Sequence, residues 1–207
     1  LKSCKSCNGF GCHNCNFTGL QNIESVESKI SYFLKKKFDA NRVQINWIGG
    51  EDQSSLVLGN GRPFFAKIIN PKKRNRLLRK SFDLDAVFLS ELRKLPVQPK
   101  GSVPFKSEIS ITIDTKKPIS SSTLKKLSTL KNAKIMNHSK DKKDNLKQIY
   151  DVHYKKLGKN RFLLDLFVDG GIPIKSFVQN SDLTPNISEL LENPCLCKKL
   201  DFKNIVV

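Results

Sequence analysis

The sequence has few acidic residues for its number of basic ones. Aspartate and glutamate together number 19 against 37 lysines and arginines, which gives a formal net charge of +18 over 207 residues. An excess this large predicts a polyanionic partner, with nucleic acid the first candidate and an anionic membrane surface the second. The hydrophobic fraction of 38% is enough for a core, so a disordered chain is excluded.

Long apolar runs are also missing. No run approaches the roughly 18 residues that a membrane-spanning helix needs, and no signal peptide is visible. We therefore expect an intracellular, cytoplasmic protein without a membrane partner. Because residue 1 is Leu1 rather than methionine, we also expect the N-terminus to be trimmed, with room for a further domain upstream.

Cysteine is confined to two short segments, which argues against the disulfide framework of a secreted protein. The first segment holds two Cys-x2-Cys pairs within twelve residues, made by Cys4, Cys7, Cys12 and Cys15. Four thiolates at this spacing suit a tetrahedral Zn²⁺ ion and leave no open position for chemistry, so we predict a structural zinc site. Cys195 and Cys197 are spaced too tightly for a usual ligand pair. We expect buried or free thiols there, with completion of the zinc site as the less favoured alternative.

Hydrophobic periodicity predicts helices and strands without a strict β-α-β rhythm. One helix follows a Ser25 N-cap, and another contains Phe88, Leu89, Leu92 and Leu95. A third covers residues 120–133, with Leu124, Leu127 and Leu130 facing inward. Strands are predicted over residues 43–47, 64–69, 109–113, 149–154, 162–168 and 200–207. This mixture predicts an α+β fold with a mixed sheet, organised as a zinc knuckle over residues 1–22 and one large domain over residues 23–207.

Basic residues gather in two stretches. Residues 72–80 contain six cations, and residues 116–147 contain ten lysines against two aspartates. A solvated helix face is the ordinary explanation for such a stretch. In a chain of this net charge, we favour contacts with RNA phosphates.

A glycine-hinged acidic loop is the most distinctive motif. The run Gly49-Gly50-Glu51-Asp52 is followed by Leu58-Gly59-Asn60-Gly61-Arg62-Pro63-Phe64. Glycine hinges often display a reactive carboxylate, although a hairpin with an acidic turn is the simpler alternative. Taken together, the two runs resemble the signature of the tRNA pseudouridine synthases that act on the TΨC arm in archaea and eukaryotes. A weaker resemblance extends from about Ser25 to the C-terminus.

The resemblance implies a reaction and a set of site residues. Asp52 would be the catalytic aspartate, and Lys175, in a segment similar to the family's lysine motif, would pair with it. Phe177 and Val178 would line the uracil pocket, while Arg62 would hold a phosphate or the backbone of the flipped nucleotide. The reaction detaches uracil and reattaches the same base through carbon, so it needs no organic cofactor. The resemblance also implies tRNA as the partner and no small-molecule substrate.

The chain also departs from the family pattern. Gly50, Ser54 and Leu56 replace two arginines and an aspartate, and Ile109 falls where the substrate-stacking tyrosine of the family is expected. A slip in that alignment, replacement by another aromatic such as Tyr150 or Tyr154, or impaired activity would each explain the isoleucine.

Three hypotheses therefore stand. The first is a tRNA pseudouridine synthase with a zinc knuckle and a catalytic domain. The second is a catalytically impaired relative that acts as a zinc-containing tRNA- or rRNA-binding protein. The third, a zinc-ribbon adaptor for ribosomal RNA, needs only the charge and the cysteines.

Overall fold

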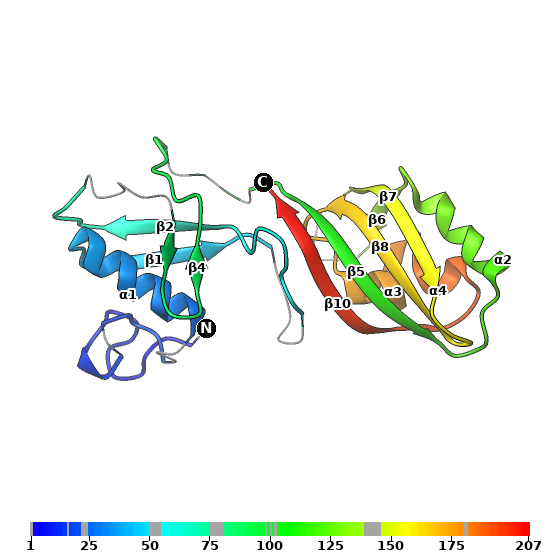
Figure 1. Cartoon of the computed structure of the whole chain (residues 1–207), viewed down its shortest axis with the longest axis horizontal. Coiled ribbons are helices and arrows are strands. Elements are labelled where there is room, and N and C mark those ends of the chain that lie inside the picture. The colour runs from blue at the N-terminus through cyan, green and yellow to red at the C-terminus, as the bar shows by residue number, and fades with distance from the viewer. Residues whose placement is uncertain are drawn as a thin grey trace. The chain divides into compact units, whose positions relative to one another are not determined.

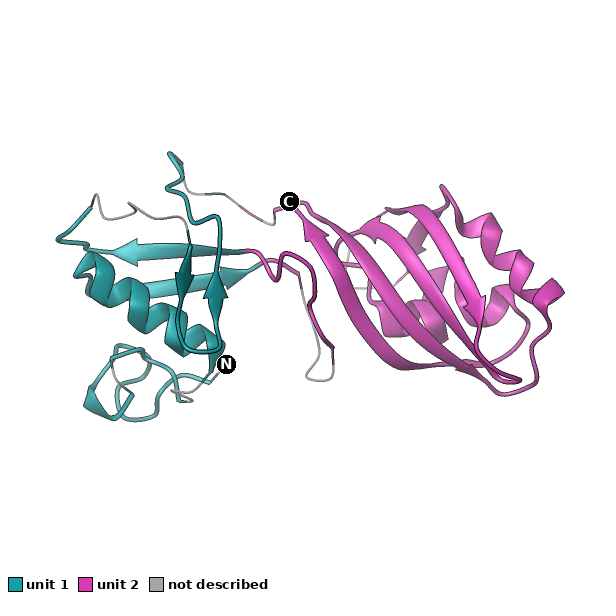
Figure 2. Cartoon of the chain, in the orientation of Figure 1, with its two compact units in different colours: residues 1–47, 64–100 teal, residues 48–63, 101–207 magenta. Residues whose placement is uncertain are grey.

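The computed structural model divides into two compact units (Figure 2). Unit 1 comprises residues 1–47 and 64–100, and unit 2 comprises residues 48–63 and 101–207. The structure describes residues 2–15, 17–21, 25–49, 55–74, 81–97, 99, 101, 103–138, 146–179 and 182–207. The predicted nucleophile Asp52 and the basic residues beyond Arg74 in the first basic stretch lie outside these ranges.

Unit 1 is built around helix α1, Val26–Phe38, which packs on a hairpin of β1, Arg42–Trp47, and β2, Phe64–Ile69 (Figure 1). The Ser25 hydroxyl accepts a hydrogen bond from the Ser28 N–H at 3.2 Å, as expected of an N-cap. Ile30, Leu34 and Phe38 are buried at four-residue spacing along α1. They share a hydrophobic cluster with Val43 of β1. The predicted helix and both predicted strands are confirmed.

The helix predicted around Phe88 is wrong. Residues Phe82–Asp83 and Phe88–Leu89 instead form two short strands, β3 and β4, which pair antiparallel. Asp85 and Ala86 connect them with φ of 55° and 64°, and the Leu84 N–H donates to the Val87 carbonyl at 2.9 Å. Two left-handed residues in a two-residue loop are typical of a hairpin turn, which ends any helix.

Unit 2 is a six-stranded sheet in the order β10-β5-β8-β7-β6-β9, with helices on one face (Figure 1). Its strands are β5 Lys106–Thr115, β6 Lys134–Asn137, β7 Lys147–Lys156, β8 Arg161–Asp169, β9 Leu183–Thr184 and β10 Cys195–Val206. Its helices are α2 Ser121–Leu124, the 3₁₀ helix η2 Lys125–Leu130, α3 Ile174–Gln179 and α4 Ile187–Leu190. The α+β class is confirmed. Neighbouring strands of this sheet run antiparallel, and a one-residue parallel bridge joins Val57 to Phe202.

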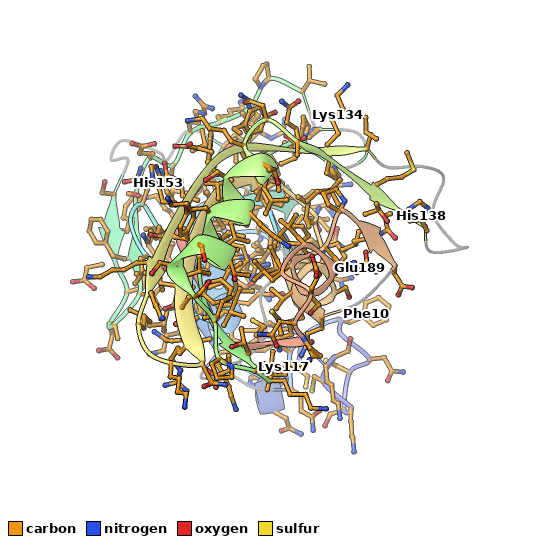
Figure 3. The ribbon with its side chains drawn as sticks, turned by 90° about the vertical axis from the view of Figure 1, so that its right-hand side faces the viewer. Phe10, Lys117, Lys134, His138, His153 and Glu189 are labelled. Atoms are coloured by element: carbon orange, nitrogen blue, oxygen red, sulfur yellow. The ribbon has the colours of Figure 1, made fainter. Side chains whose placement is uncertain are left out.

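Alternation along the strands defines two faces of this sheet. Ile109, Ile111 and Ile113 of β5 are fully buried under the helices, while the residues between them lie on the open face. Figure 3 shows the same division, with His153 of β7 and Glu189 of α4 on opposite sides of the sheet. The open face is therefore the one that the helices leave uncovered.

The segment predicted as one helix over residues 120–133 is mostly a 3₁₀ helix. Leu124, Leu127 and Leu130 are buried, as predicted, at a spacing of three residues. A 3₁₀ helix has three residues per turn, so this spacing places all three leucines on one side. The pattern in the sequence was therefore that of the tighter helix.

The two units distribute the chain differently from the predicted knuckle and large domain. The cysteine segment lies in unit 1 together with α1, β1 and β2, while residues 48–63 belong to unit 2. The division into residues 1–22 and 23–207 stays a prediction about domains. Within the described ranges, no helix is both long and apolar enough to span a membrane.

Candidate active-site loop and cysteine site

The segment after Asp52 is fixed to the edge strand β10. The Leu58 N–H donates to the Phe202 carbonyl and the Phe202 N–H donates to the Leu56 carbonyl, both at 2.8 Å. The Leu56 N–H also donates to the Asp201 carboxylate at 3.2 Å. Residues 56–58 thus extend the sheet by one short parallel segment, at the place where the β10 register shifts between Phe202 and Asn204.

Asp201 holds this segment as a charged group. Its carboxylate pairs with Lys199 at 2.5 Å, and its side chain is 14% exposed. The hydrogen bond from Lys199, assisted by the Leu56 N–H, lowers the pKa of Asp201 below its ordinary value. Asp201 is therefore ionised at neutral pH, and an ionised carboxylate makes the stronger hydrogen bond to a backbone N–H.

The two glycines of the Gly-Asn-Gly turn are needed for different structural reasons. Gly59 has φ of 61°, and a Cβ there would lie 2.6 Å from the Lys203 carbonyl oxygen. Gly61 has φ of 77°, but no atom lies within 4 Å of the place of its Cβ. Position 59 requires glycine because β10 lies too close for a side chain and because its φ is positive. Position 61 requires glycine only because its φ is positive.

Arg62 holds the start of the acidic loop. Its Nε donates to the Ile48 carbonyl at 3.2 Å and its Nη2 to the Gly49 carbonyl. The Ile48 N–H completes the neck of the loop by donating to the Pro63 carbonyl at 3.0 Å. Arg62 is thus placed three residues from Gly59 to brace the backbone that leads to Asp52, and its contact with a nucleotide stays a prediction.

Phe105 contacts the two segments that lead to the predicted catalytic pair. A Cβ at Gly49 would lie 3.4 Å from the Phe105 ring, and a Cβ at Gly170 would lie 2.3 Å from it. The Gly170 N–H also donates to the Phe105 carbonyl at 2.7 Å. The ring therefore joins the segment three residues before Asp52 to the segment five residues before Lys175.

Helix α3 divides the residues of the lysine motif between surface and core. Ile174, Phe177 and Val178 are buried at helical spacing in the main core of unit 2, and Lys175 is exposed. The turn is closed by the Phe177 N–H, which donates to the Pro173 carbonyl at 2.9 Å. Lys175 thus lies outside the core. The contact of Phe177 and Val178 with a uracil ring stays a prediction, because both side chains are fully buried among core residues.

Ile109 also lies in this core, 1% exposed and in register with Leu166. The two tyrosines considered as replacements lie on β7. Tyr154 packs against the core, whereas the Tyr150 hydroxyl donates to Asp169 at 2.9 Å. Lys106 lies 3.9 Å above the Tyr150 ring. Of the two, Tyr150 is therefore the one beside the Gly170 segment, since Asp169 precedes that glycine directly.

The four N-terminal cysteines form a compact ligand group. The Sγ atoms of Cys4, Cys7, Cys12 and Cys15 all lie within 4.8 Å of one another, with three pairs at 3.8–4.0 Å. Metal–sulfur bonds of about 2.3 Å in a tetrahedron place neighbouring sulfurs about 3.8 Å apart. Thiol geometry and donor chemistry both fit one metal ion, so the four cysteines predicted as ligands form a group that could hold a metal. That the metal is zinc stays a prediction.

Backbone N–H groups surround the thiols. Gly11 donates to Cys7 Sγ at 3.1 Å, and Cys12 and Gly19 donate to Cys15 Sγ at 3.2 and 3.3 Å. Burial raises the pKa of Cys15, but these two hydrogen bonds, together with those from the Cys7 and Cys12 thiols, outweigh burial and bring the pKa to about 6. N–H donors stabilise the thiolate that a metal requires, so the backbone is arranged for ligation.

The C-terminal cysteines lie in unit 2, on strand β10. Cys195 is buried in β10, where its thiol donates to the Asn193 carbonyl at 3.1 Å, and burial raises its pKa to about 11. Cys197 follows on the same strand, where it pairs with Ile113. A buried thiol with a raised pKa resists ionisation, which agrees with the prediction of a buried, non-ligand cysteine at Cys195.

Comparison with known proteins decides the family. The model of the family described as "Pus10, C-terminal" matches residues 10–206. The chain belongs to this family. A curated member, the tRNA pseudouridine synthase Pus10 of Nitrosopumilus maritimus (strain SCM1), is 40% identical over 206 residues, which cover 100% of this chain and 54% of the relative. The Pus10 of Cenarchaeum symbiosum (strain A) is 34% identical and is matched over 99% of this chain and 50% of its own length.

The chain therefore spans about half the length of the curated Pus10 relatives it matches. Among solved structures, it aligns with a chain of a Cbf5-Nop10-Gar1 complex at 9% identity with a TM-score of 0.47, over 82% of this chain and 42% of that one. The match of residues 10–206 to the family model shows the family predicted from the loop motif and the lysine segment.

Two elements of the site were missed from the sequence. Phe105 stands at the end of a proline- and glycine-rich stretch that predicts only a loop, and nothing local points to the distant glycines it contacts. Asp201 lies in a predicted closing strand, where an acid reads as an ordinary surface residue. Both contact residues more than 50 positions away in the sequence. Local hydrophobic periodicity does not predict such contacts.

Proposed function

We propose that this chain is the catalytic part of a tRNA pseudouridine synthase that isomerises a uridine of the TΨC arm. The observation that carries the proposal is the match of residues 10–206 to the Pus10 C-terminal family, with relatives named tRNA pseudouridine synthase. The net charge of +18 supports a nucleic-acid substrate.

Asp52 is the proposed nucleophile. In the isomerisation, the N1–C1′ bond of uridine breaks, the uracil turns, and a C5–C1′ bond forms while C5 loses its proton and N1 gains one. No atom is gained or lost overall, so the reaction needs no redox partner and no organic cofactor. Lys175 is the proposed cation that keeps Asp52 ionised in a site closed by the flipped base.

The contacts of the loop that contains Asp52, and of the segment before Lys175, support this assignment. Arg62 and the β10 edge hold the ends of the loop that contains Asp52, and the Phe105 ring lies against Gly49 and Gly170 on the way to Asp52 and Lys175. A nucleophile must be held within about 1 Å of its target, since a displacement of that size can slow a reaction about 100-fold. Loop bracing of this kind is what such a reaction requires.

The ion we propose for the four-cysteine site is Zn²⁺, held by Cys4, Cys7, Cys12 and Cys15. Four thiolate ligands close the coordination sphere, so the ion would stabilise the fold of the cysteine segment and take no part in the reaction.

A catalytically impaired relative that only binds tRNA is the second candidate. One observation favours it. Ile109, aligned with the substrate-stacking tyrosine, is buried in the core and offers no aromatic ring. Tyr150 beside Asp169 is the residue that would supply the ring if the enzyme is active.

The test is site-specific detection of pseudouridine in an unmodified tRNA transcript incubated with the chain. The proposal expects modification at a uridine of the TΨC arm, its loss in Asp52→Asn, and retained RNA binding by that variant. Binding without modification by wild type at any enzyme concentration would support the impaired relative. Modification that survives Asp52→Asn would overturn the assignment of the nucleophile.

A further inference from the structure

An aromatic side chain stands exposed on the cysteine segment. Phe10 (labelled in Figure 3) has 76% of its surface exposed, although phenylalanine is among the residues most often buried. It occupies the turn between the two cysteine pairs, flanked by Gly9 at φ of 87° and Gly11 at φ of 95°.

The backbone does fix Phe10. Its N–H donates to the Cys7 carbonyl at 2.9 Å, and the next N–H, of Gly11, donates to Cys7 Sγ at 3.1 Å. A Cβ at Gly11 would lie 2.7 Å from the Phe17 carbonyl oxygen, so the turn is tightly closed. The Phe10 ring thus lies on a turn whose backbone is bonded to a proposed metal ligand. Because this turn is already ordered, the protein loses less conformational entropy when a partner binds.

Charge indicates which partner covers it. Residues 1–23 contain no acid, and Lys2 and Lys5 of the same segment are exposed. Unit 1 carries a second phenylalanine of similar exposure, Phe88 at 70%, but residues 81–92 around it contain three acids and no base. Of these two phenylalanines, Phe10 is therefore the one that combines an exposed ring with the cations that RNA phosphates require.

A polar cavity adjoins the turn. Its volume is about 310 Å³, and its walls include Gly9 and Thr18 from the cysteine segment and Arg42, Gln44 and Asn46 from β1. Glu27 also lines it, but its carboxylate accepts a hydrogen bond from the Trp47 indole at 2.9 Å. Amide and guanidinium groups in a cavity of this size can bond the edges and ribose of a nucleotide next to a stacked base.

We propose that Phe10 is a stacking platform for an unpaired base of the RNA substrate, with Lys2 and Lys5 on the flanking phosphates. The proposal rests on the proposed function for the identity of the RNA, and it assigns a binding role to the cysteine segment that the reaction itself does not need. Stacking on an aromatic ring accepts any base, so the contact would position the RNA without selecting its sequence.

The test compares equilibrium binding of a tRNA transcript by wild type, Phe10→Ala, Phe10→Tyr, Phe10→Leu and the matched control Phe88→Ala. We expect affinity to fall about 5- to 100-fold in Phe10→Ala and nearly as much in Phe10→Leu, while Phe10→Tyr and Phe88→Ala bind like wild type. Lys5→Gln should lower the slope of log affinity against log salt by about one, and Phe10→Ala should leave that slope unchanged. Metal content of each variant shows that the cysteine site is intact.

The outcomes separate this proposal from the one before it. If Phe10→Ala binds RNA as tightly as Phe88→Ala while wild type still makes pseudouridine, the stacking role is overturned and the synthase stands. If Phe10→Leu keeps full affinity, the ring is not stacking and an apolar contact with a protein segment is the better account. If wild type binds no RNA, both proposals fall.

Discussion

Gly59 and Gly61 differ in a way that single substitutions can resolve. Gly61→Ala adds only the backbone strain of a left-handed alanine, about 1 kcal/mol of unfolding free energy. Gly59→Ala adds the same strain and also pushes a methyl group to within 2.6 Å of the Lys203 carbonyl oxygen, so we expect a clearly larger loss. Denaturant unfolding of both variants measures the difference. Equal losses would show that the turn does not lie against β10.

Asp114 and Arg161 make a residue-scale prediction about pH. They face each other across β5 and β8, with Nε to Oδ1 at 2.5 Å and Nη2 to Oδ2 at 3.0 Å. The hydrogen bond from Arg161 lowers the pKa of Asp114 below its ordinary 3.8. A carboxyl whose pKa is lower in the folded state stabilises the fold above the ordinary pKa, and that stabilisation is lost as the pH falls through the folded value.

We therefore expect Asp114→Asn to lower the Tm by a few degrees at pH 7, and the difference from wild type to shrink below about pH 4. Arg161→Gln should give the same profile with a smaller difference, because Lys198 Nζ still lies 4.0 Å from the Asp114 carboxylate. The double variant should lose little more than Asp114→Asn alone, because both changes remove the same Asp114–Arg161 interaction. A difference that stays constant down to pH 3 would contradict the ion pair as its source.

At the scale of elements, Phe105 is the contact between the Asp52 segment and the Lys175 segment. Phe105→Ala should weaken folding by about 2 kcal/mol, since the ring is only half-buried, and should slow pseudouridine formation about 10- to 100-fold by loosening both segments. RNA affinity should stay near that of wild type, because the ring positions other residues. Single-turnover rates at saturating enzyme, with binding measured separately, provide the check. Loss of affinity with an unchanged rate would show that Phe105 contacts RNA instead.

The elements were predictable where local patterns decide them. Ser25 and the four-residue spacing after it were enough for α1, and the alternation in residues 109–113 was enough for the central strand. The hairpin at residues 82–89 was missed because its turn is Asp85-Ala86, where the usual signal is glycine, and its four strand residues are too few to show a period. Leucines at three-residue spacing gave the right buried face and the wrong helix type, since the two helical periods differ by only 0.6 residue per turn.

The site was predictable where the motif is contiguous. The four cysteines were grouped correctly from their spacing in the sequence, while the site roles of the loop and the lysine segment, each also a short run, stay predictions. What holds the loop could not be predicted, because Asp201, Phe202 and Phe105 reach it through sheet pairing and packing across the chain. Tertiary contacts of this kind leave no periodic signal in one sequence.

At the scale of the whole molecule, the metal should matter to one unit. We expect one Zn²⁺ per chain, and we expect chelation at pH 7 to expose the amides of residues 2–21 to hydrogen exchange while the strands of unit 2 stay protected. The reason is that the cysteine segment has little core of its own and that β5 and β8 pack in a separate hydrophobic cluster. Metal analysis and hydrogen exchange before and after chelation measure this. Unchanged exchange in residues 2–21 would contradict a structural role for the ion.

The most direct test of the whole account is the single-turnover rate of pseudouridine formation in wild type and Asp52→Asn at equal occupancy of the tRNA. The account predicts a measurable rate for wild type at one uridine of the TΨC arm, and no product from the variant although it binds the RNA as tightly. Product formed by Asp52→Asn at a rate near that of wild type would contradict the account, because the loop that Arg62, Phe105 and β10 hold would then display nothing the reaction needs.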